Sequence, residues 1–244
     1  MFNTQCSLEW DSAVDEISGE LLRNAGVTSP PVNALDIAHS AKISVVVDRS
    51  LRVRGRHKRI GGRSTIFIRP ELRTERLQWT IAHELGEAVA WRVAERVYAF
   101  DEVSPRDREA IANRFASRLL LPTNWFLADV ERMDCDLIGL KRRYQTASHE
   151  LIAYRLLDLP IPTTITIFDQ GKLSRRKCNA HSSVPRIQRI ERICALETHE
   201  RNQACVIQED GISVQCWPIH ESDWKREIMR TVYHADFTSS HQKS

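Results

Sequence analysis

The stretch WTIAHELGE, residues 79–87, governs the interpretation of the whole sequence. It differs by one residue from H-E-x-x-H, a helical pattern in which two histidines hold zinc and the intervening glutamate acts as general base. In this chain Glu87 stands where the second histidine would be. Residues four apart share a helix face, so His83 and Glu87 can still point at one ion. Glu84 lies roughly a hundred degrees round the helix, suited to reach a water molecule rather than the metal.

A metal centre of this type needs a further protein ligand, and a second helical segment offers Glu109 as the candidate. Glu109 begins a helix face that continues through the small residues Ala112 and Ala116, which permit close packing against the first helix. Zinc accepts histidine nitrogen and glutamate oxygen, and a catalytic zinc keeps a fourth position for water. The sequence therefore predicts His83, Glu87 and Glu109 as metal ligands and Glu84 as the catalytic base.

Alternatives for these carboxylates stay open at this point. Two glutamates and one histidine neutralise zinc formally, weaken it as a Lewis acid and shift the preference toward manganese or magnesium. Alternatively, Glu87 is a solvated helix residue, or pairs with His83 or an arginine, and no metal binds. Its small and apolar neighbours favour a position near buried space, where a lone carboxylate is costly. Glu84 can be an ordinary helix residue, and Glu109 a first-turn glutamate favoured by the helix dipole.

The composition is that of a globular protein with an ordinary balance of residues. The chain has 244 residues, 42% of them hydrophobic and 27% charged, and its net charge of +3 does not by itself indicate nucleic acid. The six cysteines include no C-x-x-C pair, which argues against a cysteine-ligated structural zinc site. The N-terminus lacks the pattern of a signal peptide, and no apolar run is long enough to span a bilayer. We expect a cytoplasmic protein with reduced thiols and no membrane partner.

Hydrophobic periodicity and turn residues predict an α+β chain with a change of pattern near the proline-rich linker 159–162. We expect a core over 8–133, a small helical segment over 134–159, a β-rich α+β module over 163–236 and a disordered tail over 237–244. Cys205 and Cys216 flank the turn at Asp210-Gly211, and they would face each other if this turn joins two strands of a hairpin. Helices are expected over 8–26, 34–41, 74–97, 105–121, 123–133, 136–144, 148–157, 187–196 and 224–231, and strands over 43–47, 64–68, 164–168, from 173 onward, 205–207 and 212–214.

Three further features have a functional and a structural interpretation each. Residues 49–63 hold seven Lys or Arg and no acid, which suits an acidic partner or a nucleic-acid backbone, or else a solvated loop between two strands. The basic run 141–143 suits DNA, or packing and protein contact. His220 follows a Trp-Pro turn and either serves the active site or is a structural histidine.

Two spaced motifs, IAHELG (81–86) and E-x-x-A-N-x-F-A-x-x-L-L-L-P (109–122), resemble the ImmA/IrrE family of zincin-like metallopeptidases. The segment Ser29-Pro30-Pro31-Val32 fits the same family, residues 137–159 resemble its helix-turn-helix-like segment, and the sequence around Trp217 and Trp224 resembles the tail of stand-alone members. The resemblance covers residues 10–160 well and the rest loosely.

The resemblance implies a zincin-like core and a zinc-dependent endopeptidase that cleaves a helix-turn-helix repressor in a stress or mobile-element response. By position, His83 and Glu109 match metal ligands and Glu84 matches the general base, whereas Glu87 departs from the family pattern. The departure leaves an alternative, a catalytically degenerate member that binds a protein or DNA without cleaving.

Overall fold

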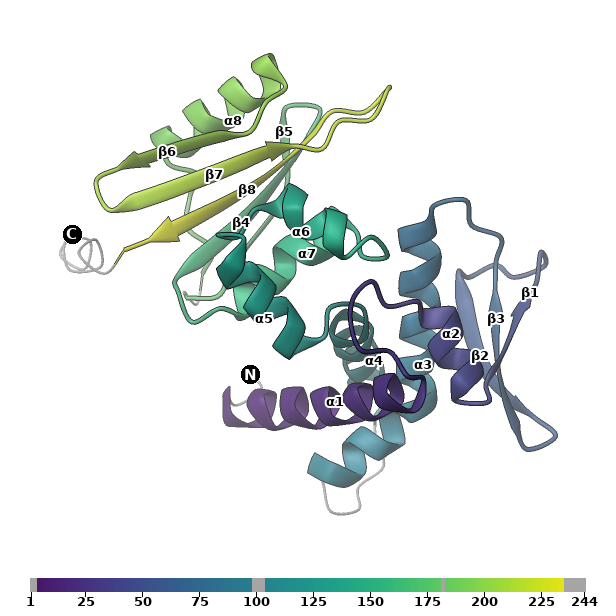
Figure 1. Cartoon of the computed structure of the whole chain (residues 1–244). Coiled ribbons are helices and arrows are strands. Elements are labelled where there is room, and N and C mark those ends of the chain that lie inside the picture. Colours follow the sequence, from purple (N-terminus) through teal and green to yellow (C-terminus); the bar gives the residue numbers. More distant parts are fainter. Residues whose placement is uncertain (1–3, 98–103, 181–182, 235–244) are drawn as a thin grey trace. The chain divides into compact units, whose positions relative to one another are not determined.

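The computed structural model describes residues 4–97, 104–180 and 183–234, with side chains from residue 9 onward (Figure 1). The chain divides into two compact units, Met1–Ser148 and His149–Ser244. Each unit combines helices with a β-sheet, so the predicted α+β class is confirmed. The expected disordered tail, 237–244, lies outside the described residues.

The first unit is built mainly from helices, two of which begin at recognisable N-cap residues. Asn33 caps the second helix by accepting a hydrogen bond from the backbone N–H of Leu35, and Ser104 caps the fourth, with Pro105 in its first turn. Its elements are α1 (Thr4–Asn24), α2 (Ala34–Ser40), β1 (Ser44–Val47), β2 (Gly55–Ile60), β3 (Arg63–Ile68), α3 (Thr74–Val97), α4 (Pro105–Leu120), α5 (Thr123–Arg132) and α6 (Leu137–Arg143).

The sheet of the first unit has the order β1-β3-β2, with β1 parallel and β2 antiparallel to β3. Strand β2 corrects the interpretation of residues 49–63 as a solvated loop. An edge strand exposes most of its side chains, so β2 shows no hydrophobic alternation that would reveal it in the sequence. Gly55 and His57 are half-buried and share one face of the strand, and Arg56 and Lys58 lie on the opposite, exposed face.

Helices α3 and α4 pack closely through small residues. A Cβ atom on Gly86 would lie 2.7 Å from the Cα of Ala112 and 3.1 Å from the Cβ of Phe115. The surrounding core is fully buried and includes Ile81, Leu85, Ile111, Phe115 and Leu119. The close helix pair that the small residues predicted is therefore present.

The second unit is a five-stranded antiparallel sheet of order β5-β4-β8-β7-β6, with α8 against one face (Figure 1). Buried residues from α8 and from strands β4, β7 and β8 form a shared core under this helix, and partly buried residues of β6 pack against it. Its elements are α7 (His149–Arg155), the 3₁₀ helix η1 (Leu156–Asp158), β4 (Thr163–Asp169), β5 (Lys172–Cys178), α8 (Arg189–Arg201), β6 (Cys205–Glu209), β7 (Ile212–Pro218) and β8 (Arg226–Tyr233).

The last regular element was predicted wrongly. A helix was expected over 224–231, but Arg226–Tyr233 is the central strand β8. A central strand is covered on both faces, and here polar Glu227, Arg230 and Thr231 are buried together with the apolar residues. The resulting pattern does not alternate, and its apolar residues at 228, 229 and 232 also fit one face of a helix.

Both predicted hairpins of the second unit are confirmed. Their turns, Gln170-Gly171 and Asp210-Gly211, have positive φ at both central residues, as the type I′ turn of a two-residue hairpin requires. Cys205 and Cys216 are direct cross-strand neighbours, and both are free thiols.

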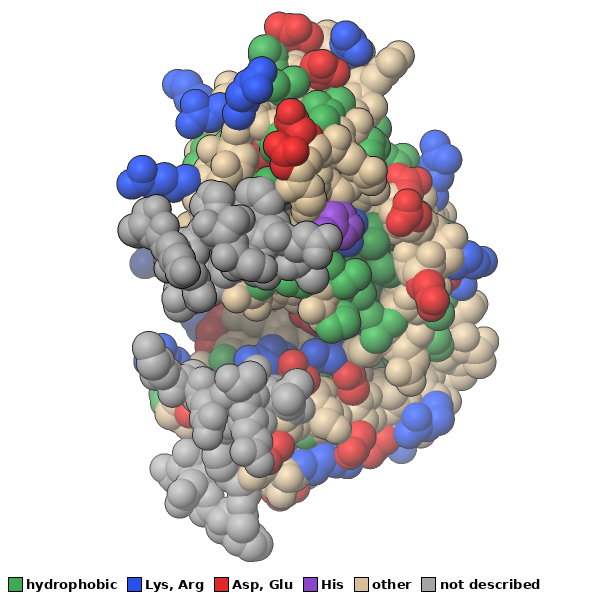
Figure 2. All heavy atoms as spheres, turned by 90° about the vertical axis from the view of Figure 1, so that its left-hand side faces the viewer, with side chains coloured by type: hydrophobic (Ala, Val, Ile, Leu, Met, Phe, Trp, Pro, Cys, Tyr) green, Lys and Arg blue, Asp and Glu red, His purple; other side chains and the backbone are tan. Residues whose placement is uncertain are grey.

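The surface carries both signs of charge. Figure 2 shows one face on which Lys and Arg side chains are interspersed with Asp and Glu side chains and with hydrophobic ones. A mixed surface of this kind gives little electrostatic attraction for a nucleic-acid backbone. Among the described helices, none is long and apolar enough to cross a membrane.

The same substitution at two helical glycines should have opposite effects on stability. Gly86→Ala should lower the free energy of unfolding by about 1–3 kcal/mol, because the new methyl group overpacks the backbone of α4. Gly19→Ala in α1 meets only the flexible end of Arg23, at 3.3 Å, and should raise it by about 0.5–1 kcal/mol. Urea denaturation of both variants measures the difference. A Gly86→Ala variant as stable as the wild type would contradict the close helix contact.

An ion pair in the second unit should make stability depend on pH. Arg226 donates to both carboxylate oxygens of Asp169, at 2.6 and 3.1 Å, and Trp224 donates to one of them. These hydrogen bonds lower the pKa of Asp169 from 3.8 to about 2, and the hydrogen bond from Arg226 has the largest effect. The ionised pair therefore stabilises the folded state above about pH 5 and loses this effect as the pH falls toward 2.

Asp169→Asn should accordingly lower the melting temperature at pH 7, and the difference from the wild type should shrink as the pH approaches 2. Asp223→Asn, at an exposed aspartate near the same hairpin, is the control and should change little. Thermal melts across this pH range provide the measurement. A constant difference at every pH would exclude the proposed ionisation.

Candidate metal centre

Helices α3 and α4 bring three predicted ligands together. His83, Glu87 and Glu109 each offer one ligand atom, and these atoms all lie within 4.8 Å of one another. Within the group, His83 Nε2 lies 3.5 Å from Glu109 Oε2. The i, i+4 spacing places His83 and Glu87 on one face of α3, and the close approach of α4 at Gly86 supplies Glu109.

Glu109 is oriented by a neighbour on its own helix. Asn113, one turn further along α4, donates from Nδ2 to Glu109 Oε1 at 3.0 Å, and the other oxygen faces His83. The Glu109 side chain is 60% exposed, so this hydrogen bond restricts a carboxylate that packing leaves mobile. Asn113 belongs to the second sequence motif, but sequence reasoning gave it no role of its own.

Glu84 is held by the edge strand β2. It is buried, and a Cβ atom on Gly55 would lie 2.7 Å from its Oε1, so Gly55 provides the space that this carboxylate occupies. The backbone N–H of His57 donates to the Glu84 carboxylate. Burial raises the pKa of Glu84, and nearby His83 opposes the rise. Sequence reasoning placed Glu84 correctly on α3 but did not foresee β2, although Gly55 and His57 at alternate positions were the available signal.

Glu87 lies in a half-buried and negatively charged environment. Burial raises the pKa of its carboxyl, Glu109 raises it further, and His83 and Arg108 oppose the rise. A site in which Glu84, Glu87 and Glu109 surround one histidine favours a bound cation over free carboxylates, because the cation relieves their mutual repulsion. Nitrogen and oxygen donors also match the preferences of zinc. The donor set therefore fits a divalent metal ion.

His57 is a feature of this region that sequence reasoning missed. Its Nε2 atom is buried and has no hydrogen-bond partner in the structure. Burial, and secondarily the charge of Arg59, lowers the pKa of this histidine, so a neutral imidazole is favoured beside the backbone that binds Glu84.

The predicted basic features differ in their surroundings. Lys141 pairs with Glu75 at 2.8 Å and Arg143 pairs with Asp129, so two of the three basic residues at 141–143 make contacts within the first unit, and Arg142 is exposed. On β2, Arg56, Lys58 and Arg59 are exposed. His220 lies in the second unit, where its Nε2 is 2.7 Å from Glu227 Oε1.

Comparison with known proteins agrees with the motifs. Residues 40–157, which include all four predicted site residues, match the family model of the IrrE N-terminal-like domain, Peptidase_M78. A solved structure described as a Mycobacterium tuberculosis transcriptional regulator is similar in fold, with a TM-score of 0.62 over 93% of this chain and 81% of that chain, at 16% sequence identity. No curated protein matches.

Changes at position 87 should tune zinc affinity in both directions. Glu87→His should bind Zn²⁺ more tightly, because imidazole is a better zinc donor in this geometry. Glu87→Gln should bind roughly 10–100-fold more weakly, because it loses a charged donor. Competition with a chromophoric chelator measures both constants. Glu95→Gln, at an exposed glutamate of the same helix, is the control, and an affinity of Glu87→Gln equal to that of this control would show that Glu87 is not a ligand.

Proposed function

Since residues 40–157 form a domain of the ImmA/IrrE family, we propose that this protein is a metal-dependent endopeptidase that regulates transcription by cleaving a helix-turn-helix repressor. The observation that carries the proposal is the convergence of His83, Glu87 and Glu109 within 4.8 Å, with the buried carboxylate of Glu84 on the same helix as His83 and Glu87. The similarity of fold to a protein described as a transcriptional regulator supports a regulatory role.

In this proposal His83, Glu87 and Glu109 hold Zn²⁺, and the oxygen-rich set also suits Mn²⁺. The metal, when bound, polarises the scissile carbonyl and makes water a better nucleophile near neutral pH. Glu84 accepts the proton of the attacking water and passes it to the leaving amide nitrogen. Its raised pKa makes it a stronger base than an exposed carboxylate, and a catalytic group works best with a pKa near the working pH. Gly55 and the backbone N–H of His57 keep that carboxylate in position.

The edge strand β2 suggests how the substrate is presented. An extended peptide can add to an exposed sheet edge through backbone hydrogen bonds, and β2 is an edge of the first sheet beside Glu84. Arg56 and Lys58 on its outward face are basic and exposed, and Arg59 further along the strand is also exposed. Acidic residues in the bound segment would therefore strengthen the complex.

A second candidate function is a regulator that binds its partner without cleaving it. The observation that favours this function is the contact between His83 and Glu109 at 3.5 Å, which lets the two side chains satisfy each other without an ion. Glu87 in place of a histidine also favours binding without cleavage, because the site has fewer nitrogen ligands for zinc.

Glu84→Gln separates the two functions. It keeps the size of the side chain and removes the base, so cleavage should slow at least ~100-fold while partner binding persists. We would express the wild type and the variant in host cells and compare newly formed protein N-termini by mass spectrometry. The proposal expects a new N-terminus in a helix-turn-helix protein with the wild type only, and capture of that protein by Glu84→Gln.

Glu95→Gln is the matched control and should cleave like the wild type. Identical N-termini with the wild type and Glu84→Gln would contradict the peptidase function. The binding function would then predict that a chelator leaves partner capture unchanged.

A further inference from the structure

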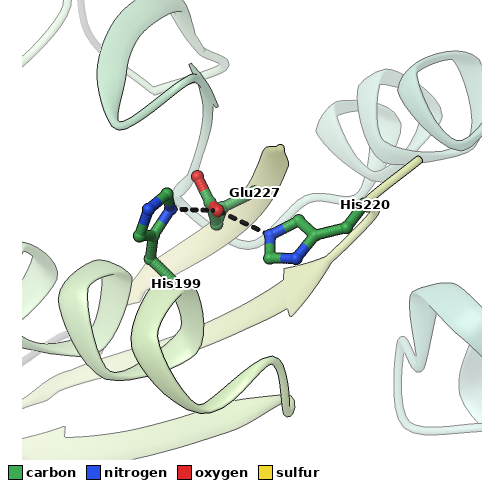
Figure 3. Close-up of side chains that lie close together, drawn as sticks. All are labelled: His199, His220 and Glu227. Carbon is green, nitrogen blue, oxygen red and sulfur yellow. Dashed lines mark hydrogen bonds and ion pairs between the residues drawn. The ribbon is translucent and has the colours of Figure 1, made fainter. Parts of the chain in front are cut away.

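A second group of metal-ligand side chains lies in the other unit, where His199, His220 and Glu227 converge (Figure 3). His199 Nδ1 and His220 Nε2 each lie 2.7 Å from the same atom, Glu227 Oε1. The two imidazole rings are 6.0 Å apart between centroids and steeply inclined at 69°. All three ligand atoms lie within 4.8 Å of one another.

Three separate elements contribute to this group. His199 is in the last turn of α8, His220 follows β7, and Glu227 lies on the central strand β8. The register pairs Glu227 with Pro218 of β7, and Ile219 donates its backbone N–H to Arg226 O, so the chain that carries His220 is fixed against β8. The group therefore depends on the tertiary fold and not on one local motif.

The three side chains of this group are buried to different degrees, with the carboxylate the most buried. The side chain of Glu227 is 1% exposed, that of His220 13% and that of His199 30%. A carboxylate buried to this degree needs compensation by hydrogen bonds or positive charge. Both nitrogens are directed at one of its oxygens, and His199 remains accessible from solvent.

We propose that His199, His220 and Glu227 form a second metal site, selective for Zn²⁺. Two imidazole nitrogens and one carboxylate oxygen are a zinc donor set that leaves a fourth position open for water or a small anion. In a zinc tetrahedron adjacent ligand atoms are ~3.4 Å apart, so the two contacts to Glu227 Oε1 lengthen slightly as the ion enters. Each neutral imidazole then carries its proton on the other ring nitrogen.

The two sites of this chain differ in donor chemistry, and so should differ in metal preference. The site in the first unit has one nitrogen and two carboxylates, whereas the second has two nitrogens and one carboxylate. Imidazole favours zinc and other late transition metals, and carboxylates suit manganese. The second site should therefore discriminate more strongly for Zn²⁺ over Mn²⁺.

The test uses the full chain with the first site disabled by His83→Ala, so that its outcome is independent of the proposed peptidase. Zn²⁺ is titrated into this variant, and bound metal is counted after equilibrium dialysis. We expect one equivalent. Adding His220→Ala should weaken this binding roughly 100-fold or more, since even the indirect partners of metal ligands contribute 10–100-fold. Adding His39→Ala, at an exposed histidine outside both groups, should leave it unchanged.

A second variant tests whether zinc is lost through misfolding, and a second metal tests whether cysteine thiols bind the ion instead. Glu227→Gln keeps the shape of the buried side chain and should also lose zinc, with circular dichroism reporting the fold. Co²⁺ bound at this site should show visible d–d absorption without sulfur-to-cobalt charge transfer. Three results would overturn the proposal: no zinc bound by His83→Ala, zinc binding unaffected by His220→Ala and Glu227→Gln, or a thiolate charge-transfer band that Cys205→Ser removes.

Discussion

The contact between Gly86 and Ala112 is the constraint on which the first site depends. It lets the backbone of α4 approach α3 to a distance that a side chain at position 86 would prevent. Glu109 lies one turn before Ala112, and this approach is what carries its carboxylate to within 3.5 Å of His83. A glycine inside a helix lowers helix propensity, so its presence in the middle of α3 indicates that close packing outweighs local stability there.

A second glycine positions the remaining member of the site. Glu84 lies on a different part of the α3 circumference from His83 and Glu87, and without support it would be a buried carboxylate with an unfavourable environment. Strand β2 resolves this conflict because Gly55 leaves space for the carboxylate and the backbone N–H of His57 binds it. The site is thus assembled from one helix with the motif, one helix that approaches closely and one edge strand.

The sequence predicted the parts that a residue pattern marks and missed those that no pattern marks. The i, i+4 pair on α3, the approach of α4 and both hairpins follow from residue patterns. Strand β2 was hidden because an exposed edge strand has no apolar alternation, and β8 because a central strand buries polar residues on both faces. The sequence singled out His220 alone. Its partners His199 and Glu227 reach it through the position of the end of α8 and the register between β7 and β8, which the sequence does not specify.

The two ion-binding candidates illustrate different ways of organising a carboxylate. Glu109 is 60% exposed and is oriented by one hydrogen bond from Asn113, so water competes for it and a metal must order it further. Glu227 is 1% exposed, and two imidazole nitrogens already lie 2.7 Å from one of its oxygens. The three ligand side chains are therefore largely ordered before a metal ion binds. Because preorganised ligands lose less entropy on binding, the nitrogen-rich group gains affinity from its burial as well as from its donors. The oxygen-rich group has to rely on electrostatic attraction between its carboxylates and the metal ion, which is the term that ionic strength and metal identity alter most.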